Sequence, residues 1–328
     1  MSSPAADPPS FTREPDLASR ALAGSVVYAT DELFAERENL ITPGPAVATA
    51  AFGPKGKVYD GWETRRRRDG GAGPDRAVVR LGVPGAVHGV VIDTAYFTGN
   101  YPPYASVEAA AVPGYPAPEE LAAADWVTLV PRSPIAGDTA NAFPVAGERR
   151  FTHVRLSIHP DGGVARFRVH GAPKPHPDLL TGTIDLAALE NGGRVVDCSN
   201  MFYGSPDNLL LADRPRHMGE GWENARRRDD GNDHVTVRLA GRARVRRVEI
   251  DTSYFIGNAP GWARVTAGDG TELVPRTRLQ PDTRHHFPVA PAPPVEQVRL
   301  DVYPDGGVAR LRVHGELEPH ALESMAIR

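Results

Sequence analysis

The chain contains the stretch VRLSIHPDGGVARFRVHG at residues 154–171 and nearly repeats it as VRLDVYPDGGVARLRVHG at residues 298–315, with 14 of 18 positions identical. Apolar and polar residues alternate over 154–159 and again over 165–170. This two-residue period is typical of a strand with one buried and one exposed face. Because the Pro-Asp-Gly-Gly sequence at 160–163 is a strong turn signal, we expect an antiparallel hairpin with a polar, strongly basic outer face.

Two further segments also occur twice, in the same order. GWETRRRRD at 61–69 returns as GWENARRRD at 221–229, and DTAYFTGN at 93–100 returns as DTSYFIGN at 251–258. The distance between the copies falls from 160 to 158 and then to 144 residues, mainly because the first copy contains a Pro- and Ala-rich insertion at 112–124. The repeat is much longer than the units of solenoid proteins, so it indicates a tandem of two whole domains.

The domain boundaries follow from the ends of the two copies. A length of 328 residues fits two domains of about 150 residues each. We place the first repeat at 24–172 and the second at 183–318, joined by the proline-rich linker 173–182. Residues 1–23 are rich in Pro, Ser and acidic residues and are expected to form a mobile arm, and 319–328 are expected to form a short tail.

The composition predicts an all-β fold. The chain has 33 Gly and 32 Pro, which suit many short strands joined by tight turns better than long helices. Further short strands are expected at 78–81 and 87–93 and at the matching residues 235–239 and 245–251. Roughly eight short strands per repeat are typical of a β-sandwich or jelly roll.

Charge and composition exclude several classes of protein. A net charge of −4 argues against nucleic acid and membrane surfaces as partners, and no apolar run approaches the roughly 20 residues that cross a bilayer. The single cysteine, Cys198, cannot form an intrachain disulfide, and residues 1–20 lack a secretory signal, so we expect a cytoplasmic protein. No nucleotide-binding or HExxH motif is present. We therefore predict no cofactor and leave a divalent metal open.

The first candidates for a ligand site are the segments at 61–69 and 221–229, which we call the Trp-Glu-Arg segments. Consecutive arginines repel one another and are expected on a solvated face or opposite an anion. Glu63 and Glu223 are the acids best placed for proton transfer, although a salt bridge to a neighbouring arginine would equally explain them. The candidate anion-binding arginines are Arg66, Arg67, Arg68, Arg226, Arg227 and Arg228.

The loops that begin with Asp-Thr are the second candidates. Each offers hydrogen-bond acceptors, donors and an aromatic wall within eight residues. A structural role is equally open, since the aromatic side chains could fill the end of the sandwich and the asparagine could support a turn. The candidate residues are Asp93, Tyr96 and Asn100 in the first copy and Asp251, Tyr254 and Asn258 in the second.

These three pairs of segments resemble the allantoicase family over residues 24–317. The resemblance implies two jelly-roll domains of the galactose-binding-like type. It also implies a hydrolase that cleaves a C–N bond of allantoate, giving ureidoglycolate and urea during purine (allantoin) breakdown. Members of the family form oligomers, and the expected basic sheet faces could serve that purpose here.

The residue types suit this small-molecule substrate. Arginine binds a carboxylate through paired hydrogen bonds, and Asp or Glu accepts the N–H groups of a ureido arm. Our hypothesis is that Glu63 or Glu223 transfers the proton, the adjacent arginines hold the carboxylate, and Asp93 or Asp251 with Tyr96 or Tyr254 orients the ureido arms.

Several alternatives remain open at this point. Each domain could hold a site, one copy could have become a scaffold, or both could line a shared site. A non-enzymatic jelly roll that binds carbohydrate or another small ligand is the competing class, since this type of fold often binds without chemistry. Hydrolysis of a related ureido acid is the other enzymatic possibility.

Overall fold

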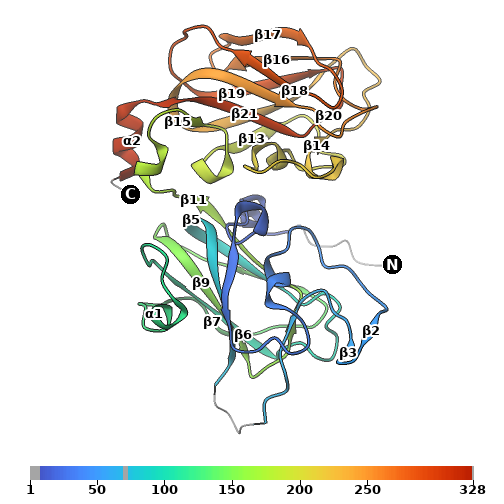
Figure 1. Cartoon of the computed structure of the whole chain (residues 1–328), viewed down its shortest axis with the longest axis vertical. Coiled ribbons are helices and arrows are strands. Elements are labelled where there is room, and N and C mark those ends of the chain that lie inside the picture. Colours follow the sequence, from blue (N-terminus) through green and yellow to red (C-terminus); the bar gives the residue numbers. More distant parts are fainter. Residues whose placement is uncertain (1–7, 69–72, 327–328) are drawn as a thin grey trace. The chain divides into compact units, whose positions relative to one another are not determined.

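The structure is a computed structural model that describes residues 8–68 and 73–326. It divides the chain into two units, Met1–Pro173 and Lys174–Arg328. Both units consist mainly of antiparallel strands (Figure 1).

The first unit is built on one curled, seven-stranded sheet. Five strands lie in the order β1 (Ser25–Ala29), β5 (Asp75–Asp93), β9 (Arg150–His159), β6 (Tyr104–Ala110) and β7 (Val127–Pro134), and β8 (Ala140–Pro144) and β11 (Arg166–Pro173) also pair with β5. The short strands are β2 (Phe52–Gly53), β3 (Gly56–Lys57), β4 (Trp62–Glu63) and β10 (Gly163–Val164). The helices are η1 (Ser10–Arg13), η2 (Arg20–Leu22), η3 (Arg37–Ile41) and α1 (Pro118–Ala122).

The second unit repeats this architecture with an eight-stranded sheet. Its strand order is β12 (Ile184–Asp185), β21 (Arg310–Leu317), β15 (Asp233–Asp251), β19 (Val295–Tyr303), β16 (Trp262–Ala267) and β17 (Glu272–Arg278), and β13 (Arg194–Cys198) and β18 (Arg284–Pro288) also pair with β15. The short strands are β14 (Trp222–Glu223) and β20 (Gly307–Val308). The helices are η4 (Pro177–Leu180), η5 (Leu189–Asn191), η6 (Pro206–Leu210), η7 (Met218–Glu220) and α2 (Pro319–Ala326).

The curled sheet of each unit folds over to form two layers, and one long strand runs through both of them. The two short strands expected at 78–81 and 87–93 are parts of the 19-residue strand β5. The first part of β5 pairs with β1 and β9, and the second part pairs mainly with β8 and β11. The pairing with β9 shifts register between Arg80 and Gly85, so the chain bends at the Gly-Val-Pro-Gly sequence instead of ending a strand there.

The prediction of a hairpin at 154–170 is wrong, because its two strands exist but do not pair with each other. β9 pairs with β6 and mainly with the first part of β5, while β11 pairs with the second part of β5 (Figure 1). The Pro-Asp-Gly-Gly loop at 160–163 therefore crosses between the two layers. Alternation of apolar and polar residues specifies which face of a strand is buried, but it does not specify the neighbouring strand.

The expected basic face of β11 is also wrong. Arg166 is 2% exposed, and its guanidinium donates to Asp60 Oδ2 at 2.7 Å and to backbone carbonyls. In the second unit Arg310 is 1% exposed and donates to Asp213 Oδ1 at 2.9 Å. Loops from earlier in the chain cover these arginines, so their charge is neutralised inside the protein.

The tryptophan of the Trp-Glu-Arg segment is part of the buried core of each unit. Trp62 and Trp222 are fully buried, and their indole N–H groups donate to Asp31 O at 2.7 Å and Asn200 O at 2.8 Å. Burying a large apolar side chain contributes about 1.5–3 kcal/mol, so each tryptophan anchors the residue that follows it. That residue is Glu63 or Glu223.

The N-terminal segment differs from the expected mobile arm over residues 8–23. Phe11, Leu17 and Leu22 are buried, and Leu17 N donates to Val169 O at 2.8 Å. The Pro and Ser content suggested mobility, but these three apolar residues attach the segment to the first sheet. The remainder of the expected arm, residues 1–7, lies outside the described residues. No helix in the described part of the chain is long and apolar enough to cross a membrane.

Candidate active site

A glutamate and an asparagine from the two repeated segments meet in each unit. Asn100 Nδ2 donates a hydrogen bond to Glu63 Oε1 at 2.8 Å, and Asn258 Nδ2 donates to Glu223 Oε1 at 2.6 Å. The glutamate ends a short strand, β4 or β14, and the asparagine lies in the loop that follows the long strand, β5 or β15. The same carboxyl–carboxamide pair thus forms twice from residues that are far apart in the sequence.

The backbone on both sides of Glu63 is fixed by pairing. β4 pairs with β10, which places Glu63 opposite Gly163, and Glu63 N donates to Ala35 O at 3.2 Å. The Glu63 side chain is half-buried, and burial raises the pKa of its carboxyl group. The hydrogen bond from Asn100 and the positive charge of Arg66 act in the opposite direction and lower that pKa. Glu63 is therefore a partly desolvated carboxyl group beside a cation and an amide.

The arginines of the segment fall into two groups. Arg67 is half-buried, and its Nη2 lies 2.8 Å from Oδ1 of the buried Asp75. Arg227 likewise places Nη1 2.6 Å from Oδ1 of the buried Asp233, and it also contacts Asp229. The guanidinium groups of Arg67 and Arg227 are therefore already bound to carboxylates of their own unit.

The arginines on either side point outward. Arg66 and Arg68 are exposed in the first unit, and Arg226 and Arg228 are exposed in the second. Within the described residues, these four guanidinium groups form no hydrogen bond or ion pair. Arg66 is close enough to Glu63 to influence the ionisation of its carboxyl group, so it is the cation that the first site offers to an anion.

The aspartates that begin the Asp-Thr loops stabilise the loops themselves. Asp93 Oδ1 accepts from Ala95 N at 2.9 Å, and Asp251 Oδ1 accepts from Ser253 N at 2.8 Å. Tyr96 and Tyr254, at φ +68°, have their backbone N–H groups held by Asp138 and Asp282, respectively, and their side chains are 42% and 46% exposed. The tyrosines project to the surface while the aspartates shape the turn.

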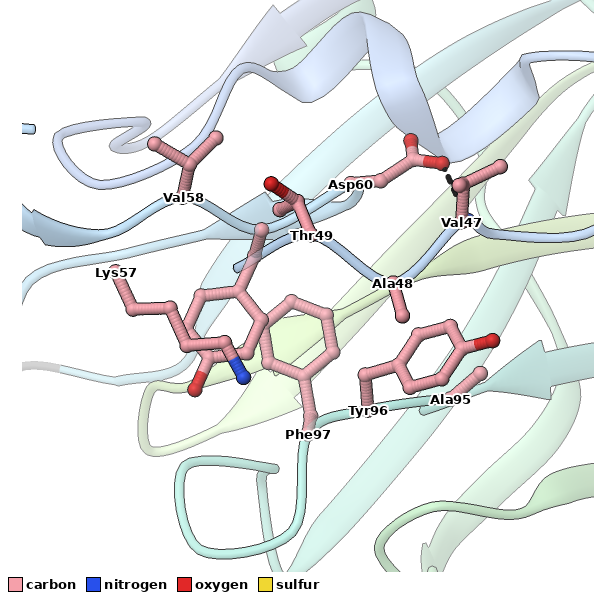
Figure 2. Close-up of a pocket in the computed structure, with 10 residues that line it drawn as sticks. Val47, Ala48, Thr49, Lys57, Val58, Asp60, Ala95, Tyr96 and Phe97 are labelled. Carbon is pink, nitrogen blue, oxygen red and sulfur yellow. Dashed lines mark hydrogen bonds between the residues drawn. The ribbon is translucent and has the colours of Figure 1, made fainter. Parts of the chain in front are cut away.

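A small hollow lies beside Tyr96 in the first unit (Figure 2). Residues 47–49 pass over the rings of Tyr96 and Phe97, and Tyr59 stacks on Phe97 with ring centroids 4.6 Å apart. Lys57 Nζ lies 5.0 Å from the centroid of the Tyr59 ring. With a volume of about 20 Å³ the hollow has room for roughly one water molecule, so a ligand would have to bind at its open rim.

Comparison with known proteins identifies the family. The model of the family described as the allantoicase repeat matches residues 15–174 and again 184–318. The chain belongs to the allantoicase family. It is 59% identical to a probable allantoicase of Nocardia farcinica, over 97% of this chain and 99% of the relative, and 50% identical to one of Streptomyces avermitilis, over 97% and 89%.

The fold comparison agrees. The crystal structure of allantoicase from Saccharomyces cerevisiae matches with a TM-score of 0.80 and 33% identity over 93% of this chain and 94% of that one. A second solved structure of an allantoicase matches with a TM-score of 0.79 at 34% identity. The all-β, two-repeat fold and the family resemblance predicted from the sequence are both confirmed.

The two sites of this allantoicase-family chain differ near the glutamate. In the first unit Arg65 Nε lies 2.6 Å from Asp31 Oδ2, whereas Ala225 and Asn200 occupy the matching positions in the second. Repetition could not reveal Lys57 and Tyr59, because the β2–β3 hairpin, which contains Lys57 and ends two residues before Tyr59, has no counterpart among the described residues of the second unit. In the sequence, the signal for these two residues is the positive charge of Lys57 two positions before the aromatic ring of Tyr59.

The second site has its own neighbours. Met218 Sδ lies 3.2 Å from Asn258 Nδ2, and Phe202 and Tyr203 are exposed beside the strand that carries Glu223. Across the described residues of both units, no three side chains of His, Cys, Asp or Glu lie close enough together to hold a metal ion.

Proposed function

We propose that this chain hydrolyses allantoate to ureidoglycolate and urea. The observation that carries the proposal is the repeated pair of a half-buried glutamate and an asparagine, next to exposed arginines, in a chain of the allantoicase family. The high identity to probable allantoicases over almost the whole chain supports the same substrate.

Substrate binding would use the groups that the protein leaves unengaged. Arg66 or Arg226 would bind the carboxylate of allantoate, since a guanidinium forms paired hydrogen bonds with a carboxylate. In each site the asparagine uses Nδ2 to bind the glutamate, which leaves its Oδ1 to accept an N–H of a ureido arm. The hydroxyl of Tyr96 or Tyr254 would contact the second arm.

Proton transfer would fall to Glu63 or Glu223. As the bond between the central carbon and one ureido nitrogen breaks, the oxygen of water bonds to that carbon and a proton must reach the departing urea. A carboxyl group can take the proton from water and deliver it to nitrogen, and a raised pKa suits both steps near neutral pH. The raised pKa of Glu63 matches this requirement.

Four of the site residues proposed from the sequence already have partners within their own unit. Arg67 and Arg227 are bound to buried aspartates, and Asp93 and Asp251 hold their own loops. We therefore propose that these four act on the shape of the site. Arg68 and Arg228 remain candidates for long-range attraction of the anionic substrate.

Single and double variants of the glutamates test the proposal. Urea and ureidoglycolate release from allantoate is measured for the parent chain, Glu63→Gln, Glu223→Gln and the double variant, with the exposed Glu119→Gln as a matched control. We expect the double variant to lose about 10²–10⁴-fold in kcat, the usual contribution of general acid–base catalysis. Full activity in the double variant would exclude the proposed proton transfer, and loss in one single variant identifies the unit with the working site.

The same assay separates the alternatives. If the parent chain binds allantoate and releases no urea, the non-enzymatic binding function is favoured. If it cleaves ureidoglycolate and leaves allantoate intact, the substrate is a related ureido acid.

Two expectations from the sequence remain proposals. We propose that copies of the chain associate into a homo-oligomer, as the family resemblance implies, which sedimentation velocity would measure. We also propose a cytoplasmic location, which cell fractionation would test.

A further inference from the structure

We propose that the Pro-Asp-Gly-Gly loop, residues 160–163 and 304–307, is the positioning element of each site. In this proposal the aspartate of the Pro-Asp-Gly-Gly loop fixes the arginines of the Trp-Glu-Arg segment. The glycines of the same loop fix the Asp-Thr loop, which carries the catalytic asparagine. The inference rests on the proposed function, because it assigns a role in the same two sites.

The aspartate of the loop binds the backbone of the arginine segment. Asp161 Oδ2 accepts from Arg67 N at 2.6 Å, and Asp305 Oδ2 accepts from Arg227 N at 2.7 Å. A carboxylate that accepts from a backbone N–H forms a stronger hydrogen bond than a neutral acceptor does. It fixes a main-chain position, whatever side chain that position carries.

A second contact holds the start of the same segment. Thr64 N donates to Gly162 O at 3.1 Å, and Gly162 N donates to Thr64 Oγ1 at 3.2 Å. In the second unit Asn224 Oδ1 accepts from Gly306 N at 2.7 Å. The residue after the glutamate and the middle arginine are therefore both bound to the loop, and Arg66 lies between these two attachment points.

The two attachments decide which arginines face outward. With Arg67 N bound to Asp161 and the Arg67 guanidinium bound to the buried Asp75, the Arg67 side chain points into the unit. The neighbours Arg66 and Arg68 are exposed, so Arg67 points inward between two arginines that point outward. Loss of the Asp161 contact would free the backbone at Arg67 and with it the place of Arg66.

The glycines of the loop hold the other half of the site. Gly163 N donates to Asn100 O at 2.8 Å, and Gly307 N donates to Asn258 O at 2.8 Å. Gly162 has φ +138°, and a Cβ at this residue would lie 2.8 Å from Asn100 O, so only glycine permits this approach. One loop thus binds both the segment that carries the glutamate and the loop that carries its asparagine partner.

Paired substitutions at the aspartate test the role. Asp161→Ala removes the acceptor, while Asp161→Asn keeps an oxygen that can accept from the same N–H; Asp305→Ala and Asp305→Asn do the same in the second unit. Asp125 is exposed and has no hydrogen bond or ion pair among the described residues, so Asp125→Ala is the matched control. For each variant we measure kcat and KM for allantoate, the Kd for allantoate by calorimetry, and the thermal midpoint.

In each unit whose Glu→Gln variant loses activity, we expect the alanine variant to lose about 10–100-fold in kcat/KM. Most of the loss should appear in KM and Kd, because Arg66 or Arg226 binds the substrate carboxylate, and the asparagine variant should recover most of it. The thermal midpoint of the asparagine variant should match that of the parent chain. A purely structural aspartate would change the midpoint and leave KM unchanged in the folded fraction.

An alanine variant with parental kcat/KM and Kd in such a unit would overturn the inference, as would a loss that follows the unfolded fraction alone. Failure of the proposed function would look different. In that case the parent chain would release no urea, or both Glu→Gln variants would remain fully active. The calorimetric Kd then still tests whether Asp161 or Asp305 positions the carboxylate-binding arginine.

Discussion

Replacement of Asn100 by alanine should make the Glu63 carboxyl group harder to ionise. Asn100 Nδ2 donates to Glu63 Oε1 at 2.8 Å, and this bond stabilises the charged form against the burial that opposes it. A hydrogen bond to a charged group contributes about 1.5–3 kcal/mol. Because Glu63 is only half-buried, we take the lower figure, which corresponds to about a tenfold fall in the acid dissociation constant of Glu63.

The direction in which the pH profile moves does not depend on the role of Glu63. If ionised Glu63 is the active base, the acidic limb of the pH profile of kcat/KM moves to higher pH in Asn100→Ala. If protonated Glu63 is the active acid, the alkaline limb moves to higher pH. The profile is measured by urea release, and the ionisation is followed directly by carbon-13 NMR of labelled glutamate, with Glu63→Gln identifying the resonance.

The second unit supplies the control. Asn258→Ala removes the matching bond to Glu223 and should leave the Glu63 resonance unchanged. A titration of Glu63 in Asn100→Ala that coincides with that of the parent chain would refute the reasoning, because the asparagine would then not stabilise the carboxylate.

Two further predictions concern stability. Burial raises the pKa of the Asp207 carboxyl group in the folded chain from 3.8 to about 6. The folded state therefore binds this proton more tightly than the unfolded state, and the stability that the bound proton provides is present below pH 3.8 and is lost as pH rises through 6. Asp207→Asn should therefore match the parent chain at pH 3.5 and be more stable at pH 8 by as much as about 3 kcal/mol, measured by urea unfolding; equal midpoints at pH 8 would contradict this. Arg310→Met should destabilise the chain by about 1–3 kcal/mol, because it leaves the backbone carbonyls of Asp213 and Glu220 without their buried donor, while the half-exposed Asp213 carboxylate returns to water. The exposed Arg238→Met is its control and should change the unfolding free energy by less than about 0.5 kcal/mol, whereas equal effects of the two variants would show that burial does not matter.

Much of the architecture could be predicted because the same three segments occur in both halves of the chain, in the same order. The alternation over residues 154–170 correctly indicates strands, and the order of the copies correctly indicates two similar domains in one chain. Glu63 and Asn100 could be singled out as candidates by their residue types and repetition, and the structure brings them within hydrogen-bond distance. Local pattern and repetition were sufficient for these features.

Features that depend on distant segments could not be predicted. Arg166 occupies a polar position in an alternating strand, but residues 44–60 cover it and supply its partners. The outward Arg66 and the inward Arg67 are indistinguishable in a run of four arginines, since the contacts of Arg67 with Asp75 and Asp161 form only in the folded chain. The pairing of β9 and β11 with β5 is likewise a choice of partner that alternation does not record.

The 19-residue strands β5 and β15 have a consequence for how each unit opens. Because a single strand supplies hydrogen bonds to both layers, neither layer can separate while the other remains intact. Each unit should therefore unfold as one cooperative block, with the slowest amide hydrogen exchange along β5 and β15. Deuterium uptake in these strands would then report the global unfolding free energy of each unit, while the loops that carry Tyr96 and Tyr254 exchange through smaller openings.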